Sequence, residues 1–282
     1  MKNPEWLEKW CKEVEGIYKG TDGIWTSITS SEVSFPTDTQ SELAKVEEIS
    51  YWFAHRNNII ADVVALFPPN GPIFDIGGGN GFVARGLIAR GYDAMVIEPG
   101  HLGTISCTSR DVPVVRAAFQ DIVPPKERTS AIGLFDVLEH IENDDAALFR
   151  LNQTLIPSGM LYVAVPAFQS LWSQEDIDGG HFRRYSVSGL REKLNRAGFE
   201  VEFETYFFAS LVLPMFFLRT LPTKLGVRSH VNMKQTAAEH SLPKGPIGHW
   251  LSRSFEKEQQ LISGGRSVSY GTSCIVAARK IT

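Results

Sequence analysis

The sequence has little cysteine and no long apolar run, and each shortage excludes a class of protein. Among 282 residues, Cys11, Cys107 and Cys274 lie far apart and form no Cys-x-x-Cys pair. This spacing indicates neither a disulfide framework nor a zinc knuckle, and it fits a reducing compartment. The longest apolar stretch, Tyr206 to Leu218, is too short to span a bilayer. The N-terminal residues have no apolar segment of signal-peptide type, so a cytoplasmic protein is expected.

The chain also lacks the basic excess of a nucleic-acid-coating protein, because its formal net charge is −4. The charge is uneven, however: from Arg219 to the end there are ten Lys or Arg residues and three Asp or Glu residues. This basic part follows the apolar segment 206–225. The combination predicts either a cover packed on the domain or a surface that meets an anionic membrane or a lipid phosphate. The protein is therefore expected in the cytoplasm, with peripheral membrane contact through 206–225 as an open alternative.

The chain does contain an alternation of short apolar strands and helical segments. Strands are expected at 72–77, 93–98, 112–118, 131–138 and 160–166, with helices between them. Two further strands are expected at 199–208 and 267–280. Apolar strands that alternate with helices predict a parallel, doubly wound α/β sheet.

The first fifty residues are expected to form a helical appendage or lid, and residues 51–282 the main domain. Leu7, Trp10, Val14 and Ile17 form one stripe at helical spacing. A loop is expected at Thr26–Thr39, and a second helix at Ser41–Phe67. An apolar and basic insertion at about 209–265 precedes the last strand. The appendage and the insertion are expected to cover a ligand pocket.

The segment FDIGGGNG, Phe74 to Gly81, concentrates glycine directly after a predicted strand. Glycine is required where a ligand approaches the backbone closely or where φ is positive. A dinucleotide fingerprint would place glycine at position 82, which is Phe82 here. Asp75 would repel a pyrophosphate but suits a ligand with an ammonium group. Glu98 ends the next strand, where a carboxylate accepts ribose hydroxyls. These features predict S-adenosylmethionine, bound by Asp75, Gly77, Gly78, Gly79 and Glu98.

With these residues the chain resembles the class I S-adenosylmethionine-dependent methyltransferases over about 50–280. FDIGGGNG resembles their first motif, VIEP their ribose-binding strand end and FDVLEHI (Phe135–Ile141) their motif after strand four. The closest subgroup, the type 11, 12 and 23-like methyltransferases, also has segments similar to YWFAHR (51–56) and to the Trp- and His-containing loop 170–186. The resemblance implies a Rossmann-like, seven-stranded, mostly parallel sheet flanked by helices. It also implies S-adenosylhomocysteine as product and a sugar or lipid-linked glycan as acceptor.

The resemblance also suggests further cofactor contacts. Asp136 is expected to face the methionine part of the cofactor. The family often has an acidic residue after strand three that contacts adenine, but Ala118 stands there in this chain. The neighbouring Phe119, Gln120 and Asp121 are the candidates to replace it.

Methyl transfer to a hydroxyl requires alignment and removal of one proton. His140 follows strand four and His181 lies in a polar loop, so either is a candidate general base. Arg183 and Arg184 are expected to bind a phosphate or carboxylate of the substrate, or else to pair with Glu175, Asp176 and Asp178. Trp172 and Tyr185 are expected to stack on the substrate, with packing as the alternative.

The spacing of Asp136, Glu139 and His140 is i, i+3 and i+4, so they share one face of a helical turn. This face is a partial site for a divalent cation. A resemblance to small-RNA 2′-O-methyltransferases, which bind metal through a similar run and a later histidine, implies His181 as a further ligand. The base hypothesis is favoured over the cation site, because Asp136 has a competing use at the cofactor. The sequence therefore predicts O-methylation of a small molecule, a sugar or a lipid-linked glycan. An NAD-dependent oxidoreductase and a non-catalytic S-adenosylmethionine-binding protein are the alternatives.

Overall fold

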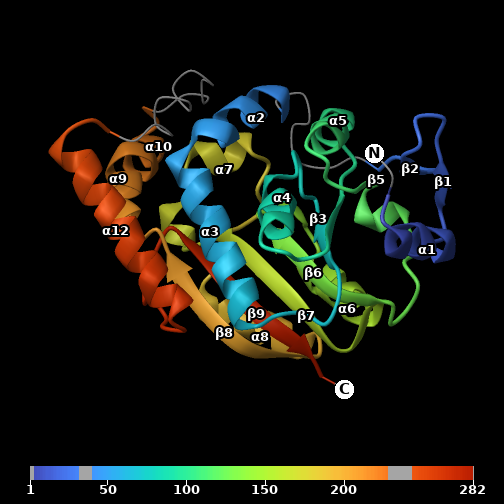
Figure 1. The fold of residues 1–282 in the computed structure, drawn as a ribbon. Helices are drawn as coiled ribbons and strands as arrows, with labels where there is room; N and C mark the ends of the chain where they lie inside the picture. The colour runs from blue at the N-terminus through green and yellow to red at the C-terminus, as the bar shows by residue number, and fades with distance from the viewer. Residues whose placement is uncertain (1–2, 32–39, 228–242, 282) are drawn as a thin grey trace.

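The computed structural model describes residues 3–31, 40–227 and 243–281, which form a mixed sheet between two layers of helices (Figure 1). The strands are β1 (Ile17–Lys19), β2 (Trp25–Ser27), β3 (Ile73–Ile76), β4 (Ala94–Ile97), β5 (Val114–Arg116), β6 (Thr129–Phe135), β7 (Leu155–Pro166), β8 (Phe199–Phe207) and β9 (Ser273–Lys280). Their order across the sheet is β1-β2-β5-β4-β3-β6-β7-β9-β8.

The centre of the sheet is parallel. β3 pairs in parallel with β4 and β6, and β5 and β7 extend the sheet on either side. β9 runs antiparallel between β7 and β8. The strands β3, β4 and β6 are buried along their whole length, as strands covered on both faces must be. The seven strands from β3 to β9 confirm the predicted α/β sheet.

Helices cover both faces of the sheet, and each layer has its own apolar core. On one face lie α1 (Glu5–Glu13), α6 (Asp144–Thr154) and α8 (Val187–Arg196). On the other lie α3 (Tyr51–Leu66), α4 (Phe82–Ala89), α5 (His101–Ser109) and α12 (Pro246–Ser263), as Figure 1 shows for α3, α4 and α12. Ser186 caps the N-terminus of α8, because its hydroxyl accepts a hydrogen bond from the Gly189 amide at 3.1 Å.

The N-terminal segment differs from the prediction in two respects. Residues 25–27 form β2, which pairs with the edge strand β5, so the expected loop begins later; residues 32–39 of that loop lie outside the described residues. The expected single helix from Ser41 is two helices, α2 (Gln40–Ile49) and α3. The break occurs because the Ser50 hydroxyl accepts a hydrogen bond from the Phe53 amide at 3.2 Å, which caps α3.

The insertion before β9 is mostly helical where it is described. After β8 and Phe208, four short helical elements follow one another directly: η5 (Ala209–Leu211), α9 (Val212–Met215), η6 (Phe216–Thr220) and α10 (Leu221–Lys224). α12 then packs against α3, and the His55 ring lies 2.8 Å from the buried Glu258 carboxylate across this contact. Within the described parts of the chain, no helix combines the length and apolar character needed to cross a membrane.

Candidate active site

A cavity of about 1510 Å³ lies at the carboxyl ends of β3, β4 and β6. This is the edge of an α/β sheet at which ligands bind. Residues of α2, α3, the helical turns after β8 and α12 also line it. The volume exceeds that of an ordinary single-ligand pocket, so a cofactor and an acceptor can occupy it together.

The glycine loop forms one wall of the cavity. Gly79 has φ of +54°, and a Cβ added there would meet no atom within 4 Å, because the position opens into the cavity. A Cβ on Gly78 would lie 2.6 Å from Oδ2 of Asp75. Gly77 and Asp75 also line the cavity. The loop therefore requires glycine for its backbone conformation and for the close approach of Asp75.

Glu98 is placed at the end of β4 as predicted. Its carboxylate accepts hydrogen bonds from the Gly79 amide at 3.0 Å and the Gly100 amide at 2.7 Å. The side chain is buried and lines the cavity. Two backbone donors thus fix the carboxylate beside the glycine loop, in a position suited to accept hydroxyl donors from a ligand.

Asp75 and Asp136 are both influenced by one arginine, Arg56. Asp75 is 1% exposed, and its two oxygens have no hydrogen-bond partner among the described residues. Burial raises its pKa to about 7, although the charge of Arg56 opposes the shift. The Arg56 guanidinium Nε lies 2.6 Å from Oδ2 of Asp136, which adopts φ of +57°. A non-glycine residue rarely adopts this conformation, which is more common at functional sites.

The segment after β5 is divided between the cavity and the N-terminal part of the chain. Phe119 and Gln120 line the cavity next to Ala118, as expected for a surface that contacts the cofactor base. Asp121 does not belong to the lining formed by the described residues. Its carboxylate instead accepts hydrogen bonds from the amide and hydroxyl of Ser31. The geometry therefore supports Phe119 and Gln120, and gives Asp121 a role in holding the N-terminal segment.

His140 and His181 meet in the cavity although they come from distant loops. Their ring centroids lie 4.7 Å apart, with the planes at 85°. Burial lowers the pKa of His140 to about 4, and the charge of His181 adds to this shift. Glu139 is completely buried beside them, and neither of its oxygens has a hydrogen-bond partner among the described residues. Burial and the charge of Asp136 hold the pKa of Glu139 well above its usual value.

Asp176 orients both His181 and Arg184. One carboxylate oxygen, Oδ1, lies 2.9 Å from Nδ1 of His181 and 2.8 Å from Nε of Arg184. Burial alone would raise the pKa of Asp176, but the hydrogen bond from His181 and the charge of Arg184 outweigh it and lower the pKa to about 2. Arg184 lines the cavity and is almost completely buried. The predicted alternative of pairing with Asp176 is therefore confirmed for Arg184.

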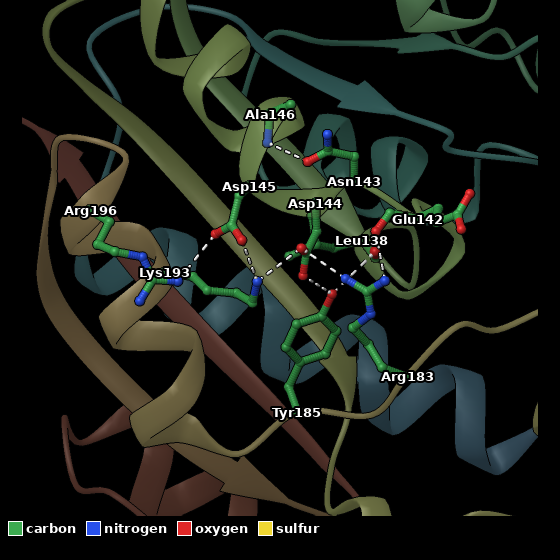
Figure 2. A network of polar contacts seen from close by, with 10 residues as sticks. All are labelled: Leu138, Glu142, Asn143, Asp144, Asp145, Ala146, Arg183, Tyr185, Lys193 and Arg196. Atoms are coloured by element: carbon green, nitrogen blue, oxygen red, sulfur yellow. Dashed lines mark hydrogen bonds and ion pairs between the residues drawn. The ribbon is translucent and has the colours of Figure 1, made fainter.

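Figure 2 shows where the neighbouring candidates lie. The Arg183 guanidinium is 2.8 Å from Oδ1 of Asp144 and donates a hydrogen bond to the Glu142 carbonyl at 2.6 Å. The Tyr185 hydroxyl donates to Oδ2 of Asp144 at 2.8 Å, and Lys193 of α8 pairs with the same carboxylate. These contacts join the loop that carries His181 to the segment that follows His140.

The substrate contacts expected of three residues are not supported by this geometry. Trp172, Arg183 and Tyr185 do not line the cavity that the described residues form. Arg183 and Tyr185 instead hold two loops together, so they position the histidines. The two arginines are adjacent in the chain but pair with different carboxylates, Arg183 with Asp144 and Arg184 with Asp176.

Two residues that line the cavity, Arg56 and Glu47, were not predicted from the sequence as site residues. Arg56 lies in the segment YWFAHR, which resembles a segment of the family. The sequence did not indicate that Arg56 forms an ion pair with Asp136. Glu47 lies on α2 and lines the cavity, and it accepts a hydrogen bond from Asn80 of the glycine loop at 2.8 Å. No sequence pattern marks Glu47, because only the fold brings α2 over the loop.

The residues at this end of the cavity fit S-adenosylmethionine. The cofactor carries an ammonium group, a sulfonium and a ribose but no phosphate. The unpartnered buried carboxylate of Asp75 suits a cationic group, and Glu98 suits ribose hydroxyls. The open face of Gly79 leaves room for a ligand against the backbone. A pyrophosphate would instead meet three carboxylates here, those of Glu47, Asp75 and Glu98.

Comparisons with known proteins agree with this site. The family model described as a methyltransferase domain matches residues 52–203. None of the curated proteins compared with the chain matches it significantly. A S-adenosylmethionine-dependent methyltransferase from Thermotoga maritima is similar in structure, with TM-score 0.55, 14% identity, and coverage of 86% of this chain and 98% of that one.

Two further solved structures show the range of proteins with this fold. The phosphoethanolamine N-methyltransferase 2 of Haemonchus contortus, solved with S-adenosylhomocysteine, has TM-score 0.51 and 14% identity, and the match covers 87% of this chain and 58% of that one. The cyclase SpnF has TM-score 0.55 and 17% identity, with coverage of 90% and 98%. These likenesses establish the fold, and the family match covers more than half of the chain. The chain therefore belongs to the methyltransferase-domain family of class I, S-adenosylmethionine-dependent proteins.

Proposed function

We propose that this protein is an active methyltransferase that methylates a hydroxyl group of a small molecule, a sugar or a lipid-linked glycan. The observation that carries the proposal is that one cavity contains both the glycine loop and the pair His140 and His181. S-adenosylmethionine, when bound, supplies an electrophilic methyl group. The chain must then hold the acceptor and remove the proton of its hydroxyl group.

The two histidines differ in their fitness to accept that proton. A general base works best when its pKa lies near the working pH, and burial places the pKa of His140 at about 4. Nδ1 of His181 lies 2.9 Å from Oδ1 of Asp176, which orients the ring in the cavity. In the protein without a bound cation, His181 is therefore the proposed base. His140 is proposed to remain neutral and to contact the acceptor.

The rim of the cavity supports an acceptor with an apolar part. Leu218, Ile247 and Trp250 line the cavity and are also exposed, and Leu213 and Phe217 extend the apolar surface beyond it. This surface comes from the segment predicted to be apolar and from the start of α12. It supports the lipid-linked class of acceptor and a peripheral membrane contact through 206–225.

An acceptor screen tests the proposal directly. The protein is incubated with S-adenosylmethionine and a panel of hydroxylated sugars and lipids, with and without a hydrocarbon chain. Formation of S-adenosylhomocysteine and of the methyl ether is measured for each acceptor. We expect turnover only with hydroxyl acceptors, and faster turnover when a hydrocarbon chain is present. Methylation of amines alone would contradict the proposal, and binding of the cofactor with no turnover on any acceptor would favour a non-catalytic binding protein.

The double variant His140→Gln with His181→Gln tests the role of the polar end of the cavity. We expect turnover to fall by about 10²–10⁴-fold, with little change in cofactor affinity because the glycine loop is unchanged. Full activity in the folded double variant would show that alignment alone drives the reaction.

A further inference from the structure

The three polar side chains at the acceptor end of the cavity form a more specific arrangement than a general base requires. Glu139 and His140 belong to the turn after β6, and His181 lies on the loop between α7 (Gln174–Asp178) and α8. One ligand atom of each side chain lies within 4.8 Å of the other two. The Phe182 amide donates a hydrogen bond to the Glu139 carbonyl at 2.8 Å, which joins the two loops next to the cluster.

The Glu139 carboxylate requires an explanation. It is completely buried, and neither oxygen has a hydrogen-bond partner among the described residues. An ionised carboxylate buried without a partner is destabilising by several kcal/mol. Arg56, whose charge acts on Glu139, is already engaged by Asp136 at 2.6 Å. A cation between Glu139 and the two imidazoles would satisfy this carboxylate.

His181 is held as a metal-binding histidine usually is. Its Nδ1 faces Oδ1 of Asp176 at 2.9 Å, so its Nε2 keeps a lone pair. Asp176 is itself fixed by the Ser173 amide at 2.8 Å and by Arg184. A buried carboxylate behind a histidine is the common arrangement around protein-bound metals, because it sets the tautomer and the ring orientation.

We infer that Glu139, His140 and His181 bind one divalent transition-metal cation, which holds the oxygen of the acceptor. The inference rests on the proposed function, since it concerns the acceptor end of the same cavity. Ligand atoms around one cation at about 2.0–2.2 Å stand no more than about 4.4 Å apart, so small side-chain rotations complete the site. Two imidazoles and a carboxylate favour Mn²⁺, Fe²⁺, Co²⁺ or Zn²⁺ over Mg²⁺ and Ca²⁺.

The cation, rather than the His181 imidazole, would then promote deprotonation of the acceptor hydroxyl. Three protein ligands leave positions open for an acceptor hydroxyl, and a bound cation lowers the pKa of a coordinated oxygen. The proton then leaves to solvent water through the mouth of the cavity. Asp136 stays outside this site, because Arg56 holds it, so the cluster differs from the three-residue helical face that the sequence suggested.

Direct cation binding provides the test. Untagged protein is treated with EDTA, dialysed and titrated with Co²⁺, followed by visible absorption, and with Zn²⁺, followed by calorimetry. We expect one equivalent of each cation to bind. Glu139→Gln and His181→Gln should each weaken binding by at least about tenfold, and Asp176→Asn by about 10–100-fold. Glu142→Gln is the matched control, since this carboxylate lies three residues along the same segment and outside the cluster.

The shift of the melting temperature on addition of Zn²⁺ provides a second measurement, which remains informative if a variant folds less stably. Saturating Zn²⁺ should raise the melting temperature of the wild type and of Glu142→Gln, but not that of Glu139→Gln. No binding by the wild type, or equal binding by Glu139→Gln, would overturn the inference. Methyl transfer measured in EDTA separates the two proposals: full activity there refutes the cation site and leaves the proposed function intact. Failure of the proposed function would show instead as no methylated hydroxyl with or without the cations.

Discussion

Asp75 is a residue on which folding and ligand binding make opposite demands. It is 1% exposed and lies next to the glycine loop. Burial raises its pKa from 3.8 to about 7; the charge of Arg56 on α3 opposes the shift, and the charge of Glu98 at the end of β4 adds to it. Replacement of Asp75 by Asn removes the titration while keeping the shape of the side chain.

The sign of the effect follows from linkage. Between pH 3.8 and 7 the folded protein keeps the Asp75 proton, whereas the unfolded chain has released it. The free energy of unfolding must therefore fall as the pH rises through this window, by up to about 1.36 kcal/mol for each pH unit. Because the group is half titrated at the upper end, the fall between pH 5 and 7 amounts to about 2 kcal/mol.

Urea unfolding of the ligand-free protein measures this quantity. The difference in unfolding free energy between wild type and Asp75→Asn, taken at pH 5, 6 and 7, cancels the contribution of other groups. We expect the wild type to lose about 2 kcal/mol relative to the variant over this range. Asp93→Asn is the matched control, because Asp93 is exposed and lies just before β4. The difference in unfolding free energy between the wild type and this variant should not change with pH. A difference that does not change with pH would refute the assignment of the raised pKa to Asp75.

Cofactor affinity should show the opposite preference. A cationic ligand favours the ionised carboxylate, so the affinity of the wild type for S-adenosylmethionine should fall as the pH drops below about 7, by up to tenfold for each unit. Asp75→Asn should bind weakly at every pH. Calorimetric titration at pH 6, 7 and 8 measures both proteins, and equal affinities would show that the carboxylate does not meet the cationic part of the ligand.

Three further substitutions test neighbouring parts of the site. Glu98→Ala should weaken binding of S-adenosylmethionine at least tenfold in calorimetry, since hydrogen bonds to a charged group contribute roughly 1.5–3 kcal/mol each; unchanged affinity in the folded variant would end the ribose assignment. Gly79→Val should abolish the titration signal without unfolding the protein, because φ is +54° and the side chain would enter the cavity. Arg183→Met should lower stability by roughly 1–2 kcal/mol and leave the KM for the acceptor unchanged, whereas a substrate-binding arginine would give the reverse.

The sequence predicted best those features that depend on short stretches of chain. The buried strands were found because apolar runs of four to seven residues lie between turn signals. Asp75 lies near the end of β3, and Glu98 and Asp136 directly follow the neighbouring strands β4 and β6, so the parallel sheet alone brings them to one edge. The break at Ser50 was missed because the helical pattern continues on both sides, and only a hydrogen bond to the Phe53 amide reveals the cap.

Features that depend on contacts between distant segments were less accessible. β1 and β2 are three residues each, and β2 exists because β5 offers an unpaired edge. Glu47 reaches the site only through the position of α2. The loop 170–186 shows the limit most clearly, because Arg183 and Arg184 are adjacent in the sequence but contact Asp144 and Asp176 in different surroundings.

The charge of the cavity connects the proposed cofactor and the inferred cation. Four arginines line it, against nine carboxyl groups among the described residues. One of them, Arg56, pairs with Asp136, and its charge also acts on Asp75. The whole chain has a formal charge of only −4, so the acidic excess is concentrated where ligands enter. An anionic cofactor would be repelled, whereas cations are attracted. Unpartnered buried carboxylates occur at both ends, Asp75 beside the glycine loop and Glu139 beside the histidines. Two separate cationic groups, one at each end, account for this distribution better than a single ligand does.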